Sequence, residues 1–522
     1  MDHPECGYLL HADFAAQARR TPEAVALYDG TRQVTYARLQ ARARHLAGAL
    51  HEAGIGRGAC VGLHLDRSID YYAVALALLH LGAAVVPLPP SYPRARIAQI
   101  LAHARLDAVV DRRDTPLTGA DGTVVLHVAD LDARAVDAVP EAVTDPDLPA
   151  FVLASSGSTG TPKLIVRSHR SFYHRLCWTW MQHPYEPGER CVQKSAMTTT
   201  HSLYELFEPL LRGVPVWILS DAEARDLPAF WDTINALSIT RLLVVPSALQ
   251  AALDLPGFAA PTLRVLVLMG EYVHHRLVAR ALAALPAQTY VCSIYGSTEA
   301  SSTLLCDLRE AYRPDQELPL GHPLVADVQA YLLDDRGQPV ADGESGVLYL
   351  GGTALFSGYF RDPAATASVL VSTAVSPARL YRTHDQVRLG ADGQLYFLGR
   401  TDHTVKVRGF RVDLQEVERT LLQHVEIRHA AVVLHEGDHE TGPTLLGFYA
   451  PATVARTSVQ QFLAQHLPAY MAPSQLVGLE SLPRTASGKT DRRQLLQQHR
   501  ERLERSTLSA VATDERQGDT VR

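Results

Sequence analysis

The sequence predicts an α/β protein with a large N-terminal domain of β-sheets flanked by helices, a β-rich subdomain, and a smaller α+β domain towards the C-terminus. Three observations indicate this fold class. Short apolar runs alternate with helical segments as far as Ile294, short strands bounded by glycine turns follow from about residue 320, and a separate α+β pattern begins after Arg400. Strands separated by helices are typical of crossover units in a mostly parallel sheet.

The first part of the chain has the clearest alternation. Helices are expected where Ala, Leu and Arg recur at helical spacing, and Gly54 and Gly82 follow the first two, as glycine often does at a helix end. These helices cover residues 36–53, 71–81 and 94–104. The expected strands cover residues 24–28, 61–65, 83–88, 150–154, 214–219, 241–245, 264–269 and 289–294.

The second part has shorter strands and tighter turns. Residues 334–337 and 391–393 carry Arg-Gly and Asp-Gly hairpin signals. A helix is expected over residues 414–423, and the charged residues 496–522 contain no apolar run that would form a core. The expected strands cover residues 328–333, 346–350, 386–389, 394–398, 430–434 and 445–449.

Composition excludes several classes of protein. The net charge of −7, from 49 basic and 56 acidic residues, argues against nucleic acid as the main partner. The six cysteines include no Cys-x-x-Cys pair, which argues against a zinc ribbon or a dithiol site. The start lacks a basic leader and no apolar run is long enough for a membrane span, so we expect a cytoplasmic protein without a membrane partner.

One segment of nine residues is suited to a polyphosphate. It follows an expected strand and combines hydroxyls, glycines whose backbone N–H groups can approach closely, and a final lysine. Its glycine spacing differs from a Walker A loop, and a surface loop rich in serine and glycine is the alternative. The segment consists of Ser155, Ser156, Gly157, Ser158, Thr159, Gly160, Thr161, Pro162 and Lys163.

Four further motifs are weak individually. Tyr295–Glu299 offers a ring, hydroxyls and a carboxylate for a base and a metal-bound phosphate, although Tyr-Gly turns are common. Asp385 is suited to two ribose hydroxyls but equally to a turn. Residues 399–411 have the composition of a solvated basic hairpin. Lys489 follows a Ser-Gly turn, where a lysine is ordinarily a surface charge.

In this order, the five motifs resemble the adenylate-forming superfamily of acyl- and aryl-CoA synthetases, adenylation domains and luciferases. Within it, the chain is most similar to a stand-alone adenylation domain of a nonribosomal peptide synthetase. The resemblance covers residues 10–495. It implies an adenylation core over residues 1–400, a mobile C-terminal domain over 401–495 and a tail over 496–522.

The resemblance implies an activity. Such an enzyme activates a carboxylic acid with ATP and Mg²⁺ as acyl-AMP, releases pyrophosphate, and passes the acyl group to the phosphopantetheine thiol of a separate carrier protein in natural-product biosynthesis. The groups implied at the reacting atoms are Lys489, Thr298 and the Mg²⁺ ligand Glu299. The implied ATP-binding residues are Ser155, Ser156, Gly157, Ser158, Thr159, Gly160, Thr161, Lys163, Tyr295, Asp385 and Arg400.

The resemblance also implies that the two domains alternate between orientations. Asp402 is the implied hinge. One orientation brings Lys489 to the acid, and the other replaces it with the loop of Lys406 and Gly409 for thiol transfer.

The acid pocket departs from the family pattern. Thr200 stands where the resemblance places an aspartate for the substrate ammonium, and a hydroxyl does not offset the desolvation of an ammonium group as a carboxylate does. A standard α-amino acid is therefore disfavoured unless its amine finds another acid such as Glu205, and a small neutral acid is expected. The implied pocket residues are Thr200, His201, Tyr204, Ser247, Val267, Met269, Ile294, Ser302 and Thr303.

Alternatives remain open at this point. The chain ends about 30 residues after Lys489, which favours a carrier supplied as a separate protein. An acyl- or aryl-CoA ligase using free CoA, or capture of an unusual small acid by an amine, fits the same motifs. A non-catalytic scaffold is the remaining interpretation, and the intact Lys163, Glu299, Asp385 and Lys489 argue against it.

Overall fold

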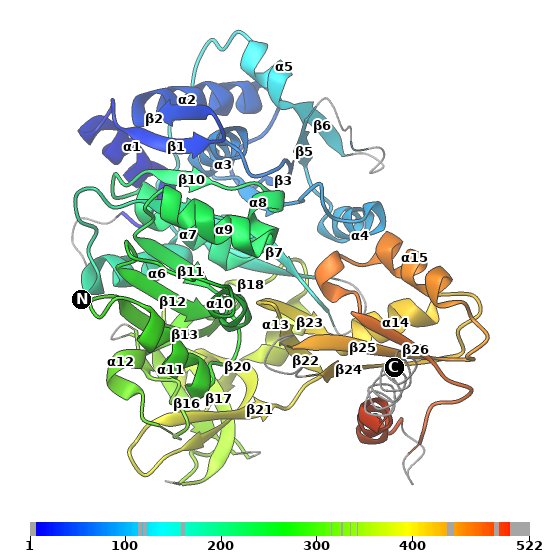
Figure 1. Cartoon of the computed structure of the whole chain (residues 1–522). Helices are drawn as coiled ribbons and strands as arrows, with labels where there is room; N and C mark the ends of the chain where they lie inside the picture. Colours follow the sequence, from blue (N-terminus) through cyan, green and yellow to red (C-terminus); the bar gives the residue numbers. More distant parts are fainter. Residues whose placement is uncertain are drawn as a thin grey trace, which may run out of the picture.

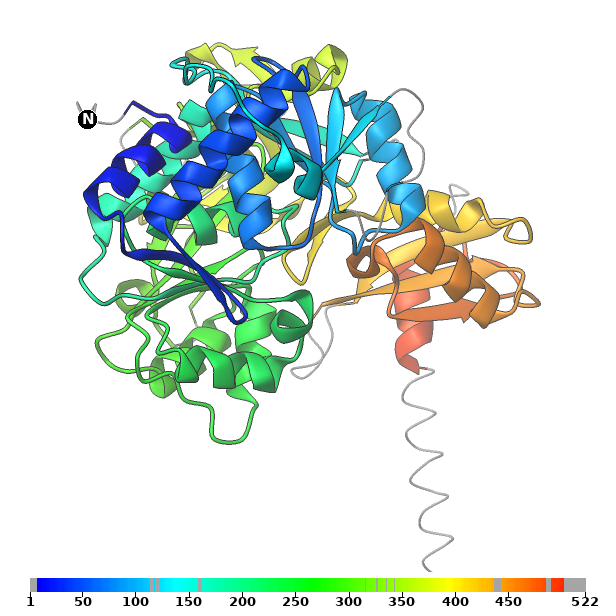
Figure 2. The ribbon, with the colours of Figure 1, turned by 90° about the horizontal axis from the view of Figure 1, so that it is seen from above.

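The computed structural model describes residues 7–112, 117, 123–157, 162–314, 316–324, 327–334, 336–341, 343–435, 443–484 and 490–501. The expected phosphate-loop residues Ser158, Thr159, Gly160 and Thr161, and the expected Lys489, lie outside these ranges. Figures 1 and 2 both show the elements from β22 onward gathered at one side of a larger body. In the part of the chain that the structure describes, no helix is long and apolar enough to cross a membrane.

A seven-stranded sheet carries the expected phosphate loop. Its strand order is β18-β8-β7-β4-β3-β5-β6, and β7 and β8 pair antiparallel with Ser155 opposite Lys163. The two ends of the loop are therefore fixed side by side. The strands are β3 Cys60–His64, β4 Ala84–Pro87, β5 Ala108–Asp111, β6 Val124–His127, β7 Pro149–Ser155, β8 Lys163–Ser168 and β18 Gly358–Tyr359.

A nine-stranded sheet carries the Tyr295–Glu299 motif and most of the expected acid pocket. Its order is β15-β14-β13-β12-β11-β9-β10-β1-β2, with parallel pairs from β13 across to β1. The strands are β1 Val25–Asp29, β2 Arg32–Thr35, β9 Cys191–Gln193, β10 Val216–Ile218, β11 Arg241–Val244, β12 Val265–Met269, β13 Tyr290–Ser297, β14 Ser301–Asp307 and β15 His322–Pro323.

The helices of the larger body follow the predicted periodicity. The Thr35 hydroxyl accepts the N–H of Arg38 at the start of α2, and α3 ends at Gly82, whose φ of +71° glycine adopts without strain. The helices are α1 Leu10–Arg20, α2 Tyr36–Glu52, α3 Ile69–Leu81, α4 Arg94–Ala104, α5 Val128–Ala133, α6 His169–Gln182, α7 Thr200–Leu210, α8 Asp221–Arg225, α9 Leu227–Ala236, α10 Pro246–Leu253, α11 His275–Ala284, α12 Leu308–Ala311 and α13 Pro363–Val369.

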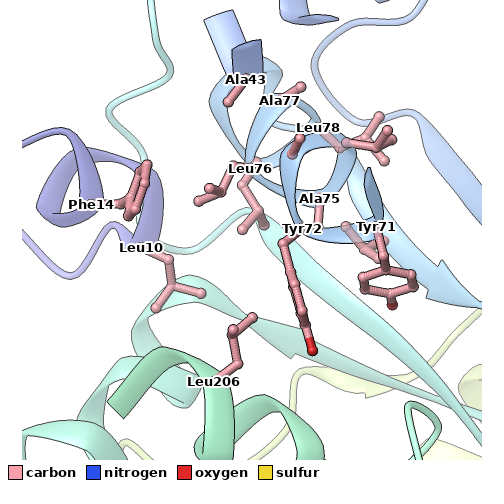
Figure 3. Close-up of a cluster of buried hydrophobic side chains, with 14 of the residues drawn as sticks. Leu10, Phe14, Ala43, Tyr71, Tyr72, Ala75, Leu76, Ala77, Leu78 and Leu206 are labelled. Carbon is pink, nitrogen blue, oxygen red and sulfur yellow. The ribbon is translucent and has the colours of Figure 1, made fainter. Parts of the chain in front are cut away.

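Helix α3 is apolar on every side and lies in the main core. Leu76 of α3 packs near Leu10 and Phe14 of α1, and Leu206 of α7 closes the cluster (Figure 3). A helix without a polar face is stable only when it is surrounded by other apolar groups, and α3 meets this condition.

Three histidines meet where α1, α3 and α6 approach one another. The His11 ring lies 5.9 Å from that of His80 and 5.5 Å from that of His169, measured between centroids. Burial lowers the pKa of His11 to about 4 and that of His169 to about 3. Both ring nitrogens of His169 lack a hydrogen-bond partner among the described residues.

A third sheet forms the β-rich part. Its order is β16-β17-β20-β19, with β21 paired to β20. The strand expected over residues 386–389 is only the end of the 14-residue β20, whose polar first half is held by β17 and β19 on its two sides. The strands are β16 Gln329–Leu333, β17 Ser345–Gly351, β19 Leu370–Thr373, β20 Ser376–Leu389 and β21 Leu395–Arg400.

The elements after Arg400 have their own apolar core, which includes the buried Val412, Val417, Val459 and Met471. The hairpin β22–β23 leads into α14, and β24, β25 and β26 form a separate sheet. Residues 492–501 are helical. The elements are β22 Thr404–Val407, β23 Phe410–Asp413, α14 Leu414–Leu422, β24 His429–His435, β25 Thr444–Ala450, α15 Arg456–His466, the 3₁₀ turn η1 Ala469–Met471 and β26 Gln475–Gly478.

Candidate active site

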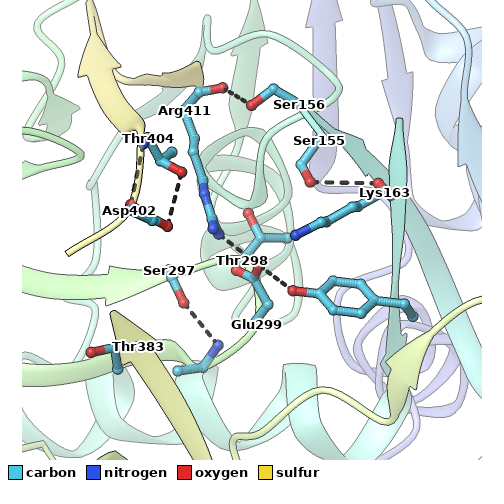
Figure 4. A network of polar contacts seen from close by, with 12 residues as sticks. Ser155, Ser156, Lys163, Ser297, Thr298, Glu299, Thr383, Asp402, Thr404 and Arg411 are labelled. Atoms are coloured by element: carbon cyan, nitrogen blue, oxygen red, sulfur yellow. Dashed lines mark hydrogen bonds and ion pairs between the residues drawn. The ribbon is translucent and has the colours of Figure 1, made fainter. Parts of the chain in front are cut away.

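Glu299 lies at the centre of a polar network (Figure 4). Its carboxylate is fully buried, and its Oε1 accepts hydrogen bonds from the Tyr359 hydroxyl at 3.1 Å and from Arg411 at 2.6 Å. Burial alone would raise the pKa of Glu299, but the Arg411 guanidinium, a backbone hydrogen bond, the Tyr359 hydroxyl and Lys163 together outweigh it and hold the pKa below its usual value. Oε2 lacks a hydrogen-bond partner among the described residues. An ionised, buried carboxylate with one unpartnered oxygen is suited to a cation.

The donor set fits magnesium in combination with a substrate phosphate. Within the described ranges, no group of three or more His, Cys, Asp or Glu side chains is arranged to hold a metal alone. Mg²⁺ commonly takes one or two protein carboxylates together with phosphate oxygens and water. Glu299 Oε2 supplies such a carboxylate oxygen, and Lys163 Nζ lies 5.4 Å from the ring centroid of Tyr359, whose hydroxyl binds Glu299.

Thr298 is held beside Glu299 through its backbone. The fully buried Arg167 donates to the carbonyl of Thr298 at 3.2 Å and to that of Glu299 at 3.3 Å. The Arg167 guanidinium therefore fixes the backbone of the turn after β13. The side chains of Thr298 and Glu299 take no part in these two bonds and are available to the site.

Asp385 forms a second centre on β20. Its carboxylate accepts hydrogen bonds from the Tyr295 hydroxyl and from Arg400, and its backbone N–H donates to Thr383 Oγ1 at 3.0 Å. The preceding His384 has a φ of +64°, a conformation that favours glycine. The structure thus places three of the expected nucleotide residues in direct contact.

The hairpin β22–β23 enters this site from the C-terminal part. Lys406 Nζ donates to the carbonyl of Gly296 at 3.3 Å, and burial lowers the pKa of Lys406. Gly409 forms the turn with a φ of +81°. The loop expected to serve thiol transfer therefore lies beside the Tyr295–Glu299 motif.

Helix α14 holds the start of the phosphate loop. The backbone N–H of Gly157 donates to Glu416 Oε2 at 2.9 Å, and Arg419 donates to the carbonyl of Gly157 at 3.0 Å. Glu416 also forms an ion pair with Arg96 of α4 at 2.5 Å, and both side chains are 2% exposed. The Ser156 hydroxyl accepts the N–H of Asp413 at 3.1 Å. Phosphate binding by Ser156 and Gly157 would therefore require these contacts with the C-terminal part to open.

The carboxylate of the expected hinge residue, Asp402, accepts hydrogen bonds from residues before and after it in the chain. Its carboxylate accepts two hydrogen bonds from Arg400, each at 2.8 Å, and further ones from the Thr404 N–H at 3.2 Å and hydroxyl at 3.0 Å. Arg400 therefore contacts both the hinge and the Asp385 centre.

The expected acid pocket is apolar on one side. Met269 on β12 and Ile294 on β13 are direct neighbours in the sheet and belong to one buried cluster, with Val267 packed against it. Ser302 and Thr303 lie on the adjacent β14.

The polar groups of the expected pocket come from α7 and β14. Burial lowers the pKa of His201 to about 3, so its ring is neutral at physiological pH. The Tyr204 hydroxyl pairs with Ser301 Oγ at 2.6 Å, whereas the buried Ser302 Oγ lacks a partner among the described residues. Thr200 is buried at the first turn of α7.

The Glu205 carboxylate already binds neighbouring groups of the protein. Its carboxylate accepts the backbone N–H groups of Lys194 at 3.0 Å and Ser195 at 2.8 Å, and the Lys194 ammonium lies at 3.4 Å. From the sequence alone, Glu205 is a candidate partner for a displaced substrate amine. These contacts remove that support.

The sequence alone indicates no role for four residues of the site: Glu271, Arg411, Glu416 and Arg96. Glu271 accepts the N–H of Ser247 at 2.8 Å and the N–H of Gly409 at 2.9 Å. An acid directly after a parallel strand is a signal that could have drawn attention to Glu271, since ligands collect at that sheet edge. The pairings of the other three depend on approaches between distant segments, which no local pattern encodes.

Comparison with known proteins agrees with this geometry. The family model described as AMP-binding enzyme matches residues 14–360, and the model described as AMP-binding enzyme C-terminal domain matches residues 416–489. Tyrocidine synthase 3 of Brevibacillus parabrevis is 32% identical over 496 residues, which are 93% of this chain but only 8% of that protein. Phosphinothricin tripeptide synthetase PhsB of Streptomyces viridochromogenes is 33% identical over 506 residues, 93% of this chain and 42% of that protein. The chain thus spans less than half the length of either relative.

Solved structures share the fold. NpsA-ThdA, an artificially fused adenylation-PCP di-domain from Klebsiella oxytoca, is 26% identical with a TM-score of 0.81, over 91% of this chain and 94% of that one. Holo-PA1221, a protein with adenylation and PCP domains, is 27% identical with a TM-score of 0.82, over 94% and 84% of the two chains. The resemblance and the fold class inferred from the sequence are confirmed. The family model covers most of the chain, which therefore belongs to the AMP-binding enzyme family of adenylate-forming ligases.

Proposed function

We propose that the protein activates a small carboxylic acid with ATP as acyl-AMP and then transfers the acyl group to the phosphopantetheine thiol of a carrier protein. The observation that carries the proposal is the buried Glu299, whose pKa lies below its usual value and whose Oε2 has no hydrogen-bond partner among the described residues, beside the Tyr359 ring that Lys163 also approaches. The proposed domains are residues 1–400 and 401–495, with a tail over 496–522.

The phosphates of ATP are assigned to the end of β7 and its loop. Ser155, Ser156, Gly157 and Lys163 contribute hydroxyls, an N–H and an ammonium, together with Ser158, Thr159, Gly160 and Thr161, which lie outside the described residues. Glu299 would hold Mg²⁺, which when bound neutralises charge on the phosphate oxygens. Thr298 stands next to Glu299 and would contact the α-phosphate.

The nucleoside is assigned to the Asp385 centre. Asp385 would accept the ribose hydroxyls, Arg400 would remain paired with that carboxylate, and Tyr295 would stack on adenine. Because Tyr295 now donates its hydroxyl to Asp385, ribose binding requires this bond to be exchanged for bonds to the ribose. Catalysis would rest on positioning and on electrostatic stabilisation of the phosphoryl oxygens, with Lys489 as the expected cation at the attacking carboxylate.

The pocket favours an acid without a charged side chain or α-ammonium. Thr200, His201 and Ser302 offer neutral polar atoms, Met269 and Ile294 offer apolar surface, and Glu205 is bound to Lys194 and Ser195. An aryl, hydroxy, keto or short aliphatic acid fits these residues better than a standard α-amino acid does.

The experiment is hydroxylamine trapping of acyl-AMP over a panel of amino, aryl, hydroxy and keto acids. Formation of the hydroxamate with neutral acids, together with pyrophosphate release, is expected. Signals from proteinogenic α-amino acids alone would contradict the substrate class. A second arm supplies either CoA or a carrier protein bearing phosphopantetheine, and transfer to the carrier alone is expected.

A further inference from the structure

One carboxylate joins the expected acid pocket to the hairpin of the C-terminal part. Glu271 follows Gly270 at the end of β12. Its Oε2 accepts the backbone N–H of Ser247 at 2.8 Å, and its Oε1 accepts the Ser247 hydroxyl at 3.0 Å. The same Oε1 accepts the backbone N–H of Gly409 at 2.9 Å. Oε1 of Glu271 therefore binds both Ser247, in the expected acid pocket, and Gly409, at the turn of the hairpin.

The backbone around this contact leaves no room for side chains. A Cβ on Gly409 would lie 2.4 Å from Val245 Cγ1, and Gly409 has a φ of +81°. A Cβ on Gly270 would lie 3.0 Å from His201 Cε1 and 3.4 Å from the Gly409 Cα. The turn at Gly409 is thus seated against the pocket wall that includes His201.

We propose that Glu271 is a positioning residue for thiol transfer, which it serves by capturing the Gly409 N–H and seating the hairpin β22–β23 against the acid pocket. This inference rests on the proposed function. Both donors that orient the Glu271 carboxylate come from Ser247, in the same part of the chain, so the carboxylate stays oriented when the hairpin leaves. Because the Glu271 side chain is already ordered, binding the Gly409 N–H loses little further side-chain entropy.

The contact belongs to one orientation of the C-terminal part. When the hairpin leaves the site, Glu271 keeps Ser247 but loses Gly409. A hydrogen bond to an ionised acceptor contributes more than a neutral one, so the loss of charge at Glu271 weakens the orientation with the hairpin in the site. Acyl-AMP formation, for which Lys489 is expected in the site instead, does not use the contact.

The test separates the two half-reactions in Glu271→Gln. Acyl-AMP formation is measured as hydroxamate with the best acid of the panel, and transfer is measured from supplied acyl-AMP to a carrier protein bearing phosphopantetheine. The ratio of transfer rate to adenylation rate is expected to fall about tenfold or more. Ser247→Ala, which keeps the Ser247 N–H, should lower the ratio less. The exposed Glu317, changed to Gln, is the matched control and should leave the ratio at the wild-type value.

Gly409→Ala keeps the proposal testable if Glu271→Gln folds poorly. Its methyl group would meet Val245, so the same fall in the ratio is expected, with partial recovery in Gly409→Ala/Val245→Ala. An unchanged ratio in Glu271→Gln, or an equal slowing of both half-reactions, would overturn the inference while the proposed function stands. A wild-type protein that gives no hydroxamate with any acid would overturn both.

Discussion

The buried ion pair between Arg96 and Glu416 should control how often the hairpin occupies the site. Arg96 lies on α4, Glu416 on α14, and each side chain is 2% exposed. We consider three variants: Arg96→Met, Glu416→Gln and the double variant. Glu416→Gln leaves a buried guanidinium unpaired, and Arg96→Met leaves a buried carboxylate unpaired.

The expected magnitude follows from burial. Removing one partner of a buried pair costs about 3–5 kcal/mol, which corresponds to a shift of about 100-fold to several thousand-fold in the docked equilibrium. Burial already raises the pKa of Glu416, so in Arg96→Met the carboxyl group can take up a proton, and the cost should be near the lower limit. In the double variant both groups are neutral, and the Gln carbonyl can still accept the Gly157 N–H. The double effect should therefore be smaller than the sum of the single effects.

The assay is the distance distribution between spin labels on the exposed Glu23 and Val425, one in each part of the chain. Each single variant should reduce the population at the distance given by the structure, and the double variant should recover most of it. Arg57→Met, which removes an exposed ion pair with Asp145, is the control and should change nothing. Single effects that add up in the double variant would refute the reasoning, because they would show that the two side chains do not interact.

Three further predictions concern chemistry and stability. Glu299→Gln should slow acyl-AMP formation about a hundredfold and weaken its dependence on Mg²⁺, measured as hydroxamate over a magnesium titration; an unchanged titration would contradict the assignment. Lys489→Ala should abolish adenylation yet spare transfer from supplied acyl-AMP, and full pyrophosphate exchange by this variant would exclude the assigned role. The folded protein holds His11 and His169 neutral, and their pKa values of about 4 and about 3 lie below the unfolded 6.5, so stability should fall as pH drops below 6.5. For His11 alone the loss approaches about 3 kcal/mol below pH 4. His169→Phe should reduce the acid-induced fall in Tm, and an identical pH dependence would show that His169 does not contribute.

The sequence predicted local elements well where periodicity is strong. The helix over residues 94–104 has the observed bounds, and the one over 36–53 differs by a single residue. The strand over 386–389 was too short because residues such as Arg379, Arg382 and His384 break the apolar alternation of β20. Neighbouring strands hold these residues in the sheet, and a single segment carries no information about its neighbours.

The candidate site could be predicted only as far as its motifs are continuous in sequence. Tyr295 and Asp385 were both selected, but their hydrogen bond was not foreseen. The pairs Arg411–Glu299 and Glu271–Gly409 join residues more than 100 positions apart, and they exist only when the C-terminal part lies in this orientation. The roles assigned to the site residues remain predictions that the experiments above test.

The position of Arg400 has a consequence for engineering. One guanidinium group binds Asp385, the proposed ribose ligand, and Asp402, the proposed hinge. A ribose that binds the oxygens of Asp385 competes with Arg400 for them and so alters the hydrogen bonds that Arg400 shares with Asp402. Chimeras that exchange C-terminal domains between related enzymes should therefore place the junction after Asp402, so that all three side chains come from one parent.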